Sequence, residues 1–85
     1  MKFVFTELSF EDYLFWQKND KHKLIRINEL LKDISRSSYE GIGRPESLRF
    51  NYAGFWSRRI DDEHRLIYRV IDIEIQIVKC RFHYD

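Results

Sequence analysis

The sequence has few of the residues that cross-link or interrupt a chain. Its 85 residues include one cysteine, one proline and three glycines. The single cysteine, Cys80, excludes an internal disulfide and any zinc site built from several cysteines. We therefore expect a reducing compartment, with the cytoplasm as the default location.

Long apolar runs and a strong net charge are also missing. The opening segment MKFVFTELSFEDY meets Glu7, Glu11 and Asp12 before the apolar core of a signal peptide could form. No later run reaches the roughly 20 apolar residues of a membrane-spanning helix. The net charge is +1, so bulk charge gives no sign of a nucleic-acid partner. We expect neither export nor membrane insertion.

The composition nevertheless predicts a packed globule. Hydrophobic residues make up 44% of the chain and aromatic residues 16%, and 85 residues are enough for one modest core, so we expect a single domain over 1–85. The three histidines are scattered and have no cysteine or histidine partner at metal-ligand spacing. We expect no metal and no cofactor.

The first half predicts one strand and two helices. Alternation around Phe3 and Phe5 predicts a strand with an aromatic buried face. Ser9 and Asp12 form a capping-box pattern for a first helix, and Asp20 can cap a second. Apolar residues of the second helix recur at helical spacing and form one stripe, namely Leu24, Ile25, Ile27, Leu30, Leu31 and Ile34.

The second half predicts strands. The segment SRSSYEGIGRPES, with the only proline, is typical of a loop. Beyond it, β-branched and aromatic residues predict four strands, which are LRFNY, FWSRRI, RLIYRVI and IEIQIVKCRF. The predicted class is α+β: an N-terminal strand, two helices, then a twisted antiparallel sheet.

Strand register decides which arginines share a face. Pairing Ile60 with Leu66 turns the apolar even positions of the hairpin inward, and Arg59, Arg65 and Arg69 then fall together on the opposite face. Taken singly, Arg58 and Arg69 are interpreted as solvated, as strand arginines usually are.

The last predicted strand changes its apolar side midway. Ile75 and Ile77 share one parity and Cys80 the other, which predicts a bulge or strong twist near Val78. Beyond it, Lys79, Arg81 and His83 would project from one side. The sequence thus predicts a basic groove with a histidine at its rim.

Glu46 could complete a reactive set with Arg59, Arg65 and His83. A carboxylate, two fixed cations and an imidazole are the groups needed to transfer a phosphoryl group from a ribose 2′-hydroxyl without metal. Solvated surface side chains remain the simpler interpretation, because spacing alone is weak support.

Four motifs support the reactive interpretation. The segments WQKNDKHKLIRINELLKDI, YEGIGRPESL, GFWSRRIDDEHRLIY and CRFHY resemble the YoeB/Txe branch of the RelE-type toxins, and the match runs from the first strand to Tyr84. The resemblance implies the RelE-like microbial RNase fold and metal-free cleavage of mRNA in the ribosomal A site. It also implies a YefM/Phd-type antitoxin and a homodimer.

The resemblance also assigns roles to residues. It implies that Glu46 is the general base, His83 the general acid and Arg65 the phosphate stabiliser, while Tyr84 orients the nucleotide. Basic residues that would contact RNA are Arg44, Arg49, Arg59 and Arg81. Two departures stand out: Arg44 and Arg49 stand where relatives carry lysine, which keeps the charge, and Asp85 follows the terminal tyrosine.

The remaining candidates are expected to be structural. We expect His22 on a helix surface and His64 in a turn, although His64 could contact ribosomal RNA. Cys80 is expected to be an inert core thiol. The competing hypothesis is a non-catalytic RNA- or protein-binding module of the same fold, because fold alone does not fix function.

Overall fold

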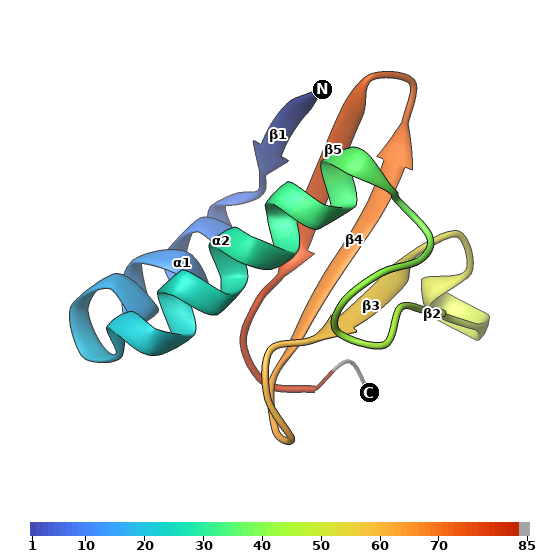
Figure 1. Ribbon diagram of the computed structural model, residues 1–85. Helices are drawn as coiled ribbons and strands as arrows, with labels where there is room; N and C mark the ends of the chain where they lie inside the picture. The colour runs from blue at the N-terminus through green and yellow to red at the C-terminus, as the bar shows by residue number, and fades with distance from the viewer. Residues whose placement is uncertain (84–85) are drawn as a thin grey trace.

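The computed structural model describes residues 1–83 and places two helices on one face of a five-stranded sheet (Figure 1). The elements follow the predicted order, with bounds β1 Lys2–Phe5, α1 Glu7–Asn19, α2 Lys21–Arg36, β2 Glu46–Ser47, β3 Trp56–Arg59, β4 Arg65–Ile71 and β5 Glu74–Lys79. The strand order is β1-β5-β4-β3-β2. Within the described residues, no helix is long and apolar enough to cross a membrane. The predicted α+β class is confirmed.

The sheet is mixed, whereas the sequence predicted an antiparallel one. β1 runs parallel to β5, and every other neighbouring pair is antiparallel. β1 comes first in the chain and β5 last, with both helices and the other strands between them. β1 therefore pairs with a strand that is distant in sequence, and it lies at the edge of the sheet. At that edge Phe3 is 45% exposed, so its predicted burial is wrong.

The two helices begin at different kinds of cap. Thr6, rather than the predicted Ser9, caps α1: its hydroxyl accepts the Ser9 N–H at 3.0 Å, and Ser9 Oγ accepts the Thr6 N–H at 2.9 Å. Ser9 is also buried, and its hydroxyl donates to the Ile77 carbonyl at 2.7 Å. Asp20 caps α2 as predicted, accepting the N–H groups of His22 and Lys23.

The core lies between α2 and the sheet. The predicted helical stripe is confirmed at four buried positions and wrong at Ile25, which is 54% exposed because it lies outside the i, i+3, i+4 repeat. The buried residues that form the core cluster with the stripe are Trp16, Ile60, Leu66, Tyr68, Ile75, Ile77 and Cys80.

The β3–β4 hairpin has a tighter register than predicted. Arg59 pairs with Arg65 and Arg58 with Leu66, two residues away from the expected pairing of Ile60 with Leu66. The Ile60 N–H instead donates to the His64 carbonyl at 3.0 Å, so only three residues form the connection. The shift is even, so the parity is unchanged and the predicted faces hold.

The predicted β5 bulge is confirmed. Ile67 pairs with Lys79 and Tyr68 with Ile77, which leaves Val78 as the extra residue. The strand ends at Lys79, however, so the alternation expected to carry Arg81 and His83 to one side does not extend past it.

The segment LRFNY is a turn, and the predicted strand is wrong. Phe50–Tyr52 form a 3-10 turn, and only Glu46–Ser47 pair with β3. Phe50 has φ of +57°, a left-handed backbone that an extended strand does not allow, and it is 91% exposed.

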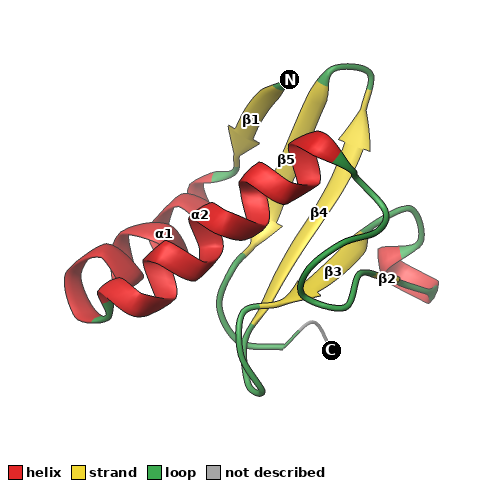
Figure 2. Ribbon diagram, viewed as in Figure 1, coloured by secondary structure: helices red, strands yellow, loops and turns green. Residues whose placement is uncertain are grey.

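Arg58 is buried completely, which overturns its interpretation as a solvated strand residue. Its guanidinium contacts the long loop that leads from α2 to β2, which Figure 2 draws in green. There it pairs with Asp33 and donates to the backbone carbonyls of Ser37, Glu40 and Ile42 at 2.7–3.0 Å. Its Nε donates to the Tyr68 hydroxyl at 3.2 Å. These bonds fasten the loop to the sheet.

We predict that Arg58→Met destabilises the fold strongly. The substitution removes the ion-pair partner of the partly buried Asp33 carboxylate and leaves three loop carbonyls without this donor, a loss of about 3–5 kcal/mol in the free energy of unfolding. Arg59→Met is the matched control, because the Arg59 side chain makes no hydrogen bond or ion pair within residues 1–83. Equal urea midpoints for the two variants would contradict the assignment.

Candidate active site

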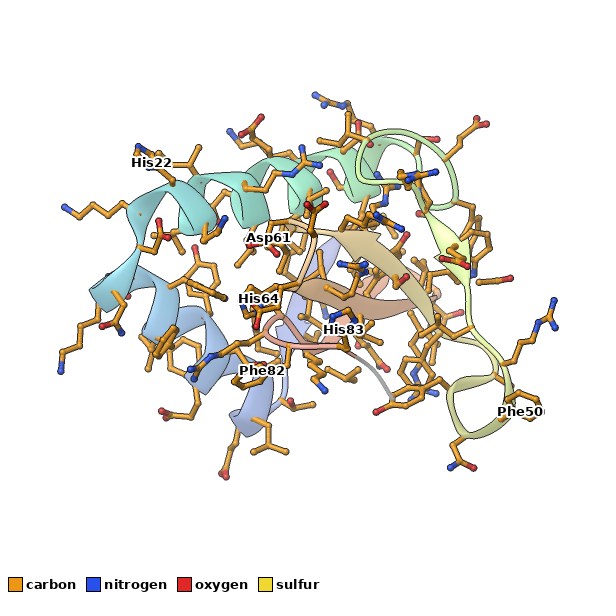
Figure 3. The ribbon with its side chains drawn as sticks, turned by 90° about the horizontal axis from the view of Figure 1, so that it is seen from below. His22, Phe50, Asp61, His64, Phe82 and His83 are labelled. Atoms are coloured by element: carbon orange, nitrogen blue, oxygen red, sulfur yellow. The ribbon has the colours of Figure 1, made fainter. Side chains whose placement is uncertain are left out.

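The β3–β4 turn is organised around the Asp61 carboxylate (Figure 3). The N–H groups of Glu63 and His64 donate to Asp61 Oδ1 at 2.8 and 2.6 Å, and Lys23 Nζ lies 2.8 Å from Oδ2. Burial raises the pKa of the Asp61 carboxyl, but these donors outweigh burial and bring it down to about 2. The turn is therefore tied to α2 through a charged group.

Arg65 begins β4 and is about nine-tenths buried. Its Nη1 donates to the carbonyls of Asp61, His64 and Asp62 at 2.8, 3.1 and 3.3 Å. Every side-chain hydrogen bond of Arg65 in the described part of the chain uses this one nitrogen. Arg65 thus closes the turn and leaves its remaining N–H groups for another acceptor.

Arg59 lies directly opposite Arg65 on the neighbouring strand. Opposed residues of an antiparallel pair point to the same face, with Cβ atoms roughly 5 Å apart, and like charges so placed are destabilising. No carboxylate forms an ion pair with either guanidinium within residues 1–83. Two close cations without an anion form a site that suits a phosphate.

Glu46 reaches the same face from β2 at the sheet edge. It pairs with Ser57, which is two residues from Arg59 and so about 7 Å along the strand. The preceding loop is fixed where the Arg59 N–H donates to the Gly43 carbonyl at 2.7 Å. Gly43 has φ of +82°, and a Cβ there would meet Leu30 Cδ2 at 2.7 Å, so the turn requires glycine.

A surface pocket of about 390 Å³ opens beside Glu46. Its lining continues along the chain through Ser47, Leu48 and Arg49 to the exposed ring of Phe50. Glu46 itself is exposed, as a group that meets a substrate must be. The Glu46 carboxylate therefore lies at the rim of a pocket, on the strand next to the one that carries Arg59.

The C-terminal tail reaches Arg65 through residue 82. The Trp16 indole donates to the Cys80 carbonyl at 2.8 Å, and the Arg65 N–H donates to the Phe82 carbonyl at 3.0 Å. The next residue, His83, is exposed, and Figure 3 shows it beside the turn that carries Asp61. The tail therefore delivers an imidazole to the end of the sheet where the arginines lie.

The other predicted site residues lie apart from this group. Arg44 and Arg49 are exposed on the loops around β2. The Arg81 guanidinium stacks over the Phe15 ring of α1, 3.4 Å from its centroid, and its Nε has no hydrogen-bond partner among residues 1–83. Tyr84 lies outside the described residues. Within 1–83 no cluster of three or more histidine, cysteine or acidic residues is placed to hold a metal.

Cys80 and His64 were both expected to be structural residues, and the structure shows a different environment for each. Burial raises the pKa of the Cys80 thiol to about 12, which confirms an inert core thiol. His64 lies in the β3–β4 turn as predicted, but it is buried and contacts the tail. Its even parity in the hairpin, shared with Leu66, is the signal that could have predicted this. Nothing in the sequence pattern predicts the exposed ring of Phe50.

Sequence comparisons give a family. A family described as "YoeB-like toxin of bacterial type II toxin-antitoxin system" matches residues 5–84. Toxin YoeB of Synechocystis sp. is 56% identical over 85 residues, covering 100% of this chain and 99% of that protein. Toxin YoeB of Escherichia coli K12 is 52% identical over 84 residues, covering 99% and 100%. The chain belongs to the YoeB toxin family. The resemblance predicted from the motifs is confirmed.

Solved structures agree with the YoeB assignment. The YoeB/ParE toxin from Agrobacterium tumefaciens has a TM-score of 0.96 at 44% identity, covering 99% of this chain and 100% of that one. A YoeB dimer from Staphylococcus aureus has a TM-score of 0.93 at 49% identity, and the YoeB–YefM complex from the same organism 0.92 at 48%; each match covers 99% of this chain and 98% of that one. YafQ of Escherichia coli shares the fold at 17% identity and a TM-score of 0.73, covering 96% and 92%.

The low pKa of Asp61 predicts a specific pH dependence for this YoeB-family chain. The carboxyl titrates near 3.8 when unfolded and near 2 when folded, so its contribution is complete above about pH 5 and disappears as the pH falls to 2. Asp61→Asn should lower the free energy of unfolding by about 1–2 kcal/mol at pH 7 and much less at pH 2. Urea unfolding across this range measures the difference, with exposed Asp62→Asn as the control. A difference independent of pH would contradict this origin.

Proposed function

We propose that this YoeB-family toxin is a ribosome-dependent endoribonuclease that cleaves mRNA in the ribosomal A site and so inhibits translation. One observation carries the proposal: Arg59 and Arg65 pair across two strands with no carboxylate partner in the described chain. Glu46 shares their face, and His83 directly follows Phe82, whose carbonyl accepts the Arg65 N–H. We propose that the scissile phosphodiester is bound between these groups.

The proposed reaction is a transfer within the RNA. Glu46 takes the proton of a ribose 2′-hydroxyl, and the resulting oxygen attacks the adjacent phosphorus. The bond from phosphorus to the 5′-oxygen breaks, and His83 donates the proton that this leaving oxygen needs. Arg65 and Arg59 neutralise the charge that builds on the phosphate. The products are a cyclic 2′,3′-phosphate and a 5′-hydroxyl, and no metal takes part in the proposed steps.

Binding would use the surrounding basic residues. Arg44 and Arg49 are exposed next to the Glu46 pocket and are placed to contact RNA phosphates, whereas Arg81 could reach RNA only from the α1 side. Tyr84 keeps its proposed role in orienting the nucleotide. We further propose a homodimer and a YefM/Phd-type antitoxin that covers the arginines. A YoeB dimer and a YoeB–YefM complex from Staphylococcus aureus support the two partners.

His83→Gln should separate chemistry from folding. Glutamine keeps hydrogen bonding but cannot act as the acid, so the single-turnover cleavage rate on programmed ribosomes should fall by roughly 10²-fold or more. His83 is exposed, so the melting temperature and ribosome affinity should hardly change. A near wild-type rate in a folded variant would show that His83 is not the acid. Arg65 is a poor probe for this purpose, because its removal also frees the carbonyls of the turn.

Growth arrest tests the enzyme against a non-catalytic binding module. Induced expression without antitoxin should stop growth for the wild-type chain and not for Glu46→Gln, which keeps the size and polarity of an exposed side chain. Equal arrest by both would favour a binding module that blocks the ribosome without cleavage. Mapping mRNA ends on stalled ribosomes from the same cells shows directly whether cleavage occurs.

A further inference from the structure

His64 holds a position that the proposed chemistry does not use. It lies between the β3–β4 turn and the tail and is only 8% exposed. Its ring packs edge-on against Trp16, with centroids 4.8 Å apart, and tilts against Phe82 at 5.7 Å (Figure 3). A titratable ring is therefore enclosed between α1 and the segment that carries His83.

The His64 ring accepts a hydrogen bond from the tail. The Phe82 N–H donates to His64 Nδ1 at 2.8 Å, and the Phe82 carbonyl accepts the Arg65 N–H at 3.0 Å. His64, which precedes β4, and Arg65, which begins it, thus hold both backbone polar groups of residue 82. An accepting Nδ1 carries no proton, so the ring proton lies on Nε2, which faces Glu63 Oε1 at 3.5 Å.

Residue 82 also needs to be held. Phe82 has φ of +64°, a left-handed backbone that is unfavourable for an aromatic residue and persists only where the surroundings enforce it. Its ring is half exposed, so burial in the core does not supply that enforcement. The two hydrogen bonds from residues 64 and 65 do. The left-handed turn at residue 82 then sets the direction in which the chain continues to His83.

We propose that His64 is a positioning residue: its Nδ1 fixes the left-handed turn at Phe82 and so holds the His83 imidazole at the leaving oxygen. The inference rests on the proposed function, and it assigns His64 an effect on the rate through His83 without any contact with RNA. Displacing a catalytic group by about 1 Å can lower a rate by 10²-fold, so a local loosening of the tail suffices.

Three variants test the acceptor. In His64→Asn the side-chain oxygen takes the place of Nδ1, whereas His64→Leu keeps apolar bulk and removes the acceptor. A full-length chain ligated at Cys80, with an ester in place of the Phe82 N–H, removes the donor and leaves His64 intact. We expect the leucine variant and the ester to lose roughly 10- to 100-fold in single-turnover cleavage with unchanged ribosome affinity, and the asparagine variant to stay within a few-fold of wild type.

Hydrogen exchange and a double-mutant cycle decide whether His64 acts through His83. The Phe82 amide should exchange slowly in wild type and His64→Asn, and fast in His64→Leu. In a His83→Gln background, His64→Leu should cause no further loss of rate, because two residues of one functional unit are not additive. An additive loss, or a folded His64→Leu or ester chain with the wild-type rate, overturns the proposal. A wild-type rate for His83→Gln alone would instead reject the proposed acid.

Discussion

The buried guanidinium of Arg58 is the interaction on which the site side of the molecule depends. It is completely enclosed and is neutralised by Asp33, whose carboxyl pKa it lowers. Its other donors go to backbone carbonyls of the loop after α2, so one side chain replaces the secondary structure that this loop lacks. The loop then presents the Gly43 carbonyl to Arg59 and β2 to β3. The position of Glu46 at the sheet edge thus depends on the buried charge of Arg58.

The opposed positions of Arg59 and Arg65 destabilise the sheet by charge repulsion but create a site suited to an anion. Arg59 and Arg65 are opposed in the register, and each is held by backbone: Gly43 receives the Arg59 N–H, and the turn carbonyls receive Arg65 Nη1. The turn carbonyls fix the Arg65 side chain without cancelling its charge, whereas a carboxylate would do both. Asp61 supplies negative charge nearby, but its carboxylate is occupied by Lys23 and two backbone N–H groups. The arginines therefore stay available to an external phosphate.

The sequence predicted those features that depend on periodicity. The α2 stripe, the span of β4 and the bulge at Val78 follow from apolar spacing, because burial on one face enforces it. Prediction from the sequence failed where a polar side chain is buried and stabilised there by hydrogen bonds. Arg58 shares the inward parity of Trp56 and Ile60, yet its charge favoured a solvated interpretation, and Ser9 acts as the partner of the Thr6 cap. The left-handed backbone of Phe50 and Phe82 was not predicted, because a positive φ leaves no pattern in the neighbouring residues.

The site joins three segments that have little contact of their own, and each is secured by a different polar group. Arg58 secures the loop before Glu46, Asp61 the turn before Arg65, and His64 the tail before His83. All three anchors act on backbone groups: those bound by Asp61 and His64 lie one or two residues from the proposed site residue, and those bound by Arg58 lie four to nine residues before Glu46. The Glu46 and His83 side chains can then be exposed while the backbone that carries them is held in place. This explains how a chain of 85 residues can present an open site on a small core: rigidity comes from buried hydrogen bonds to main chain, not from depth of burial.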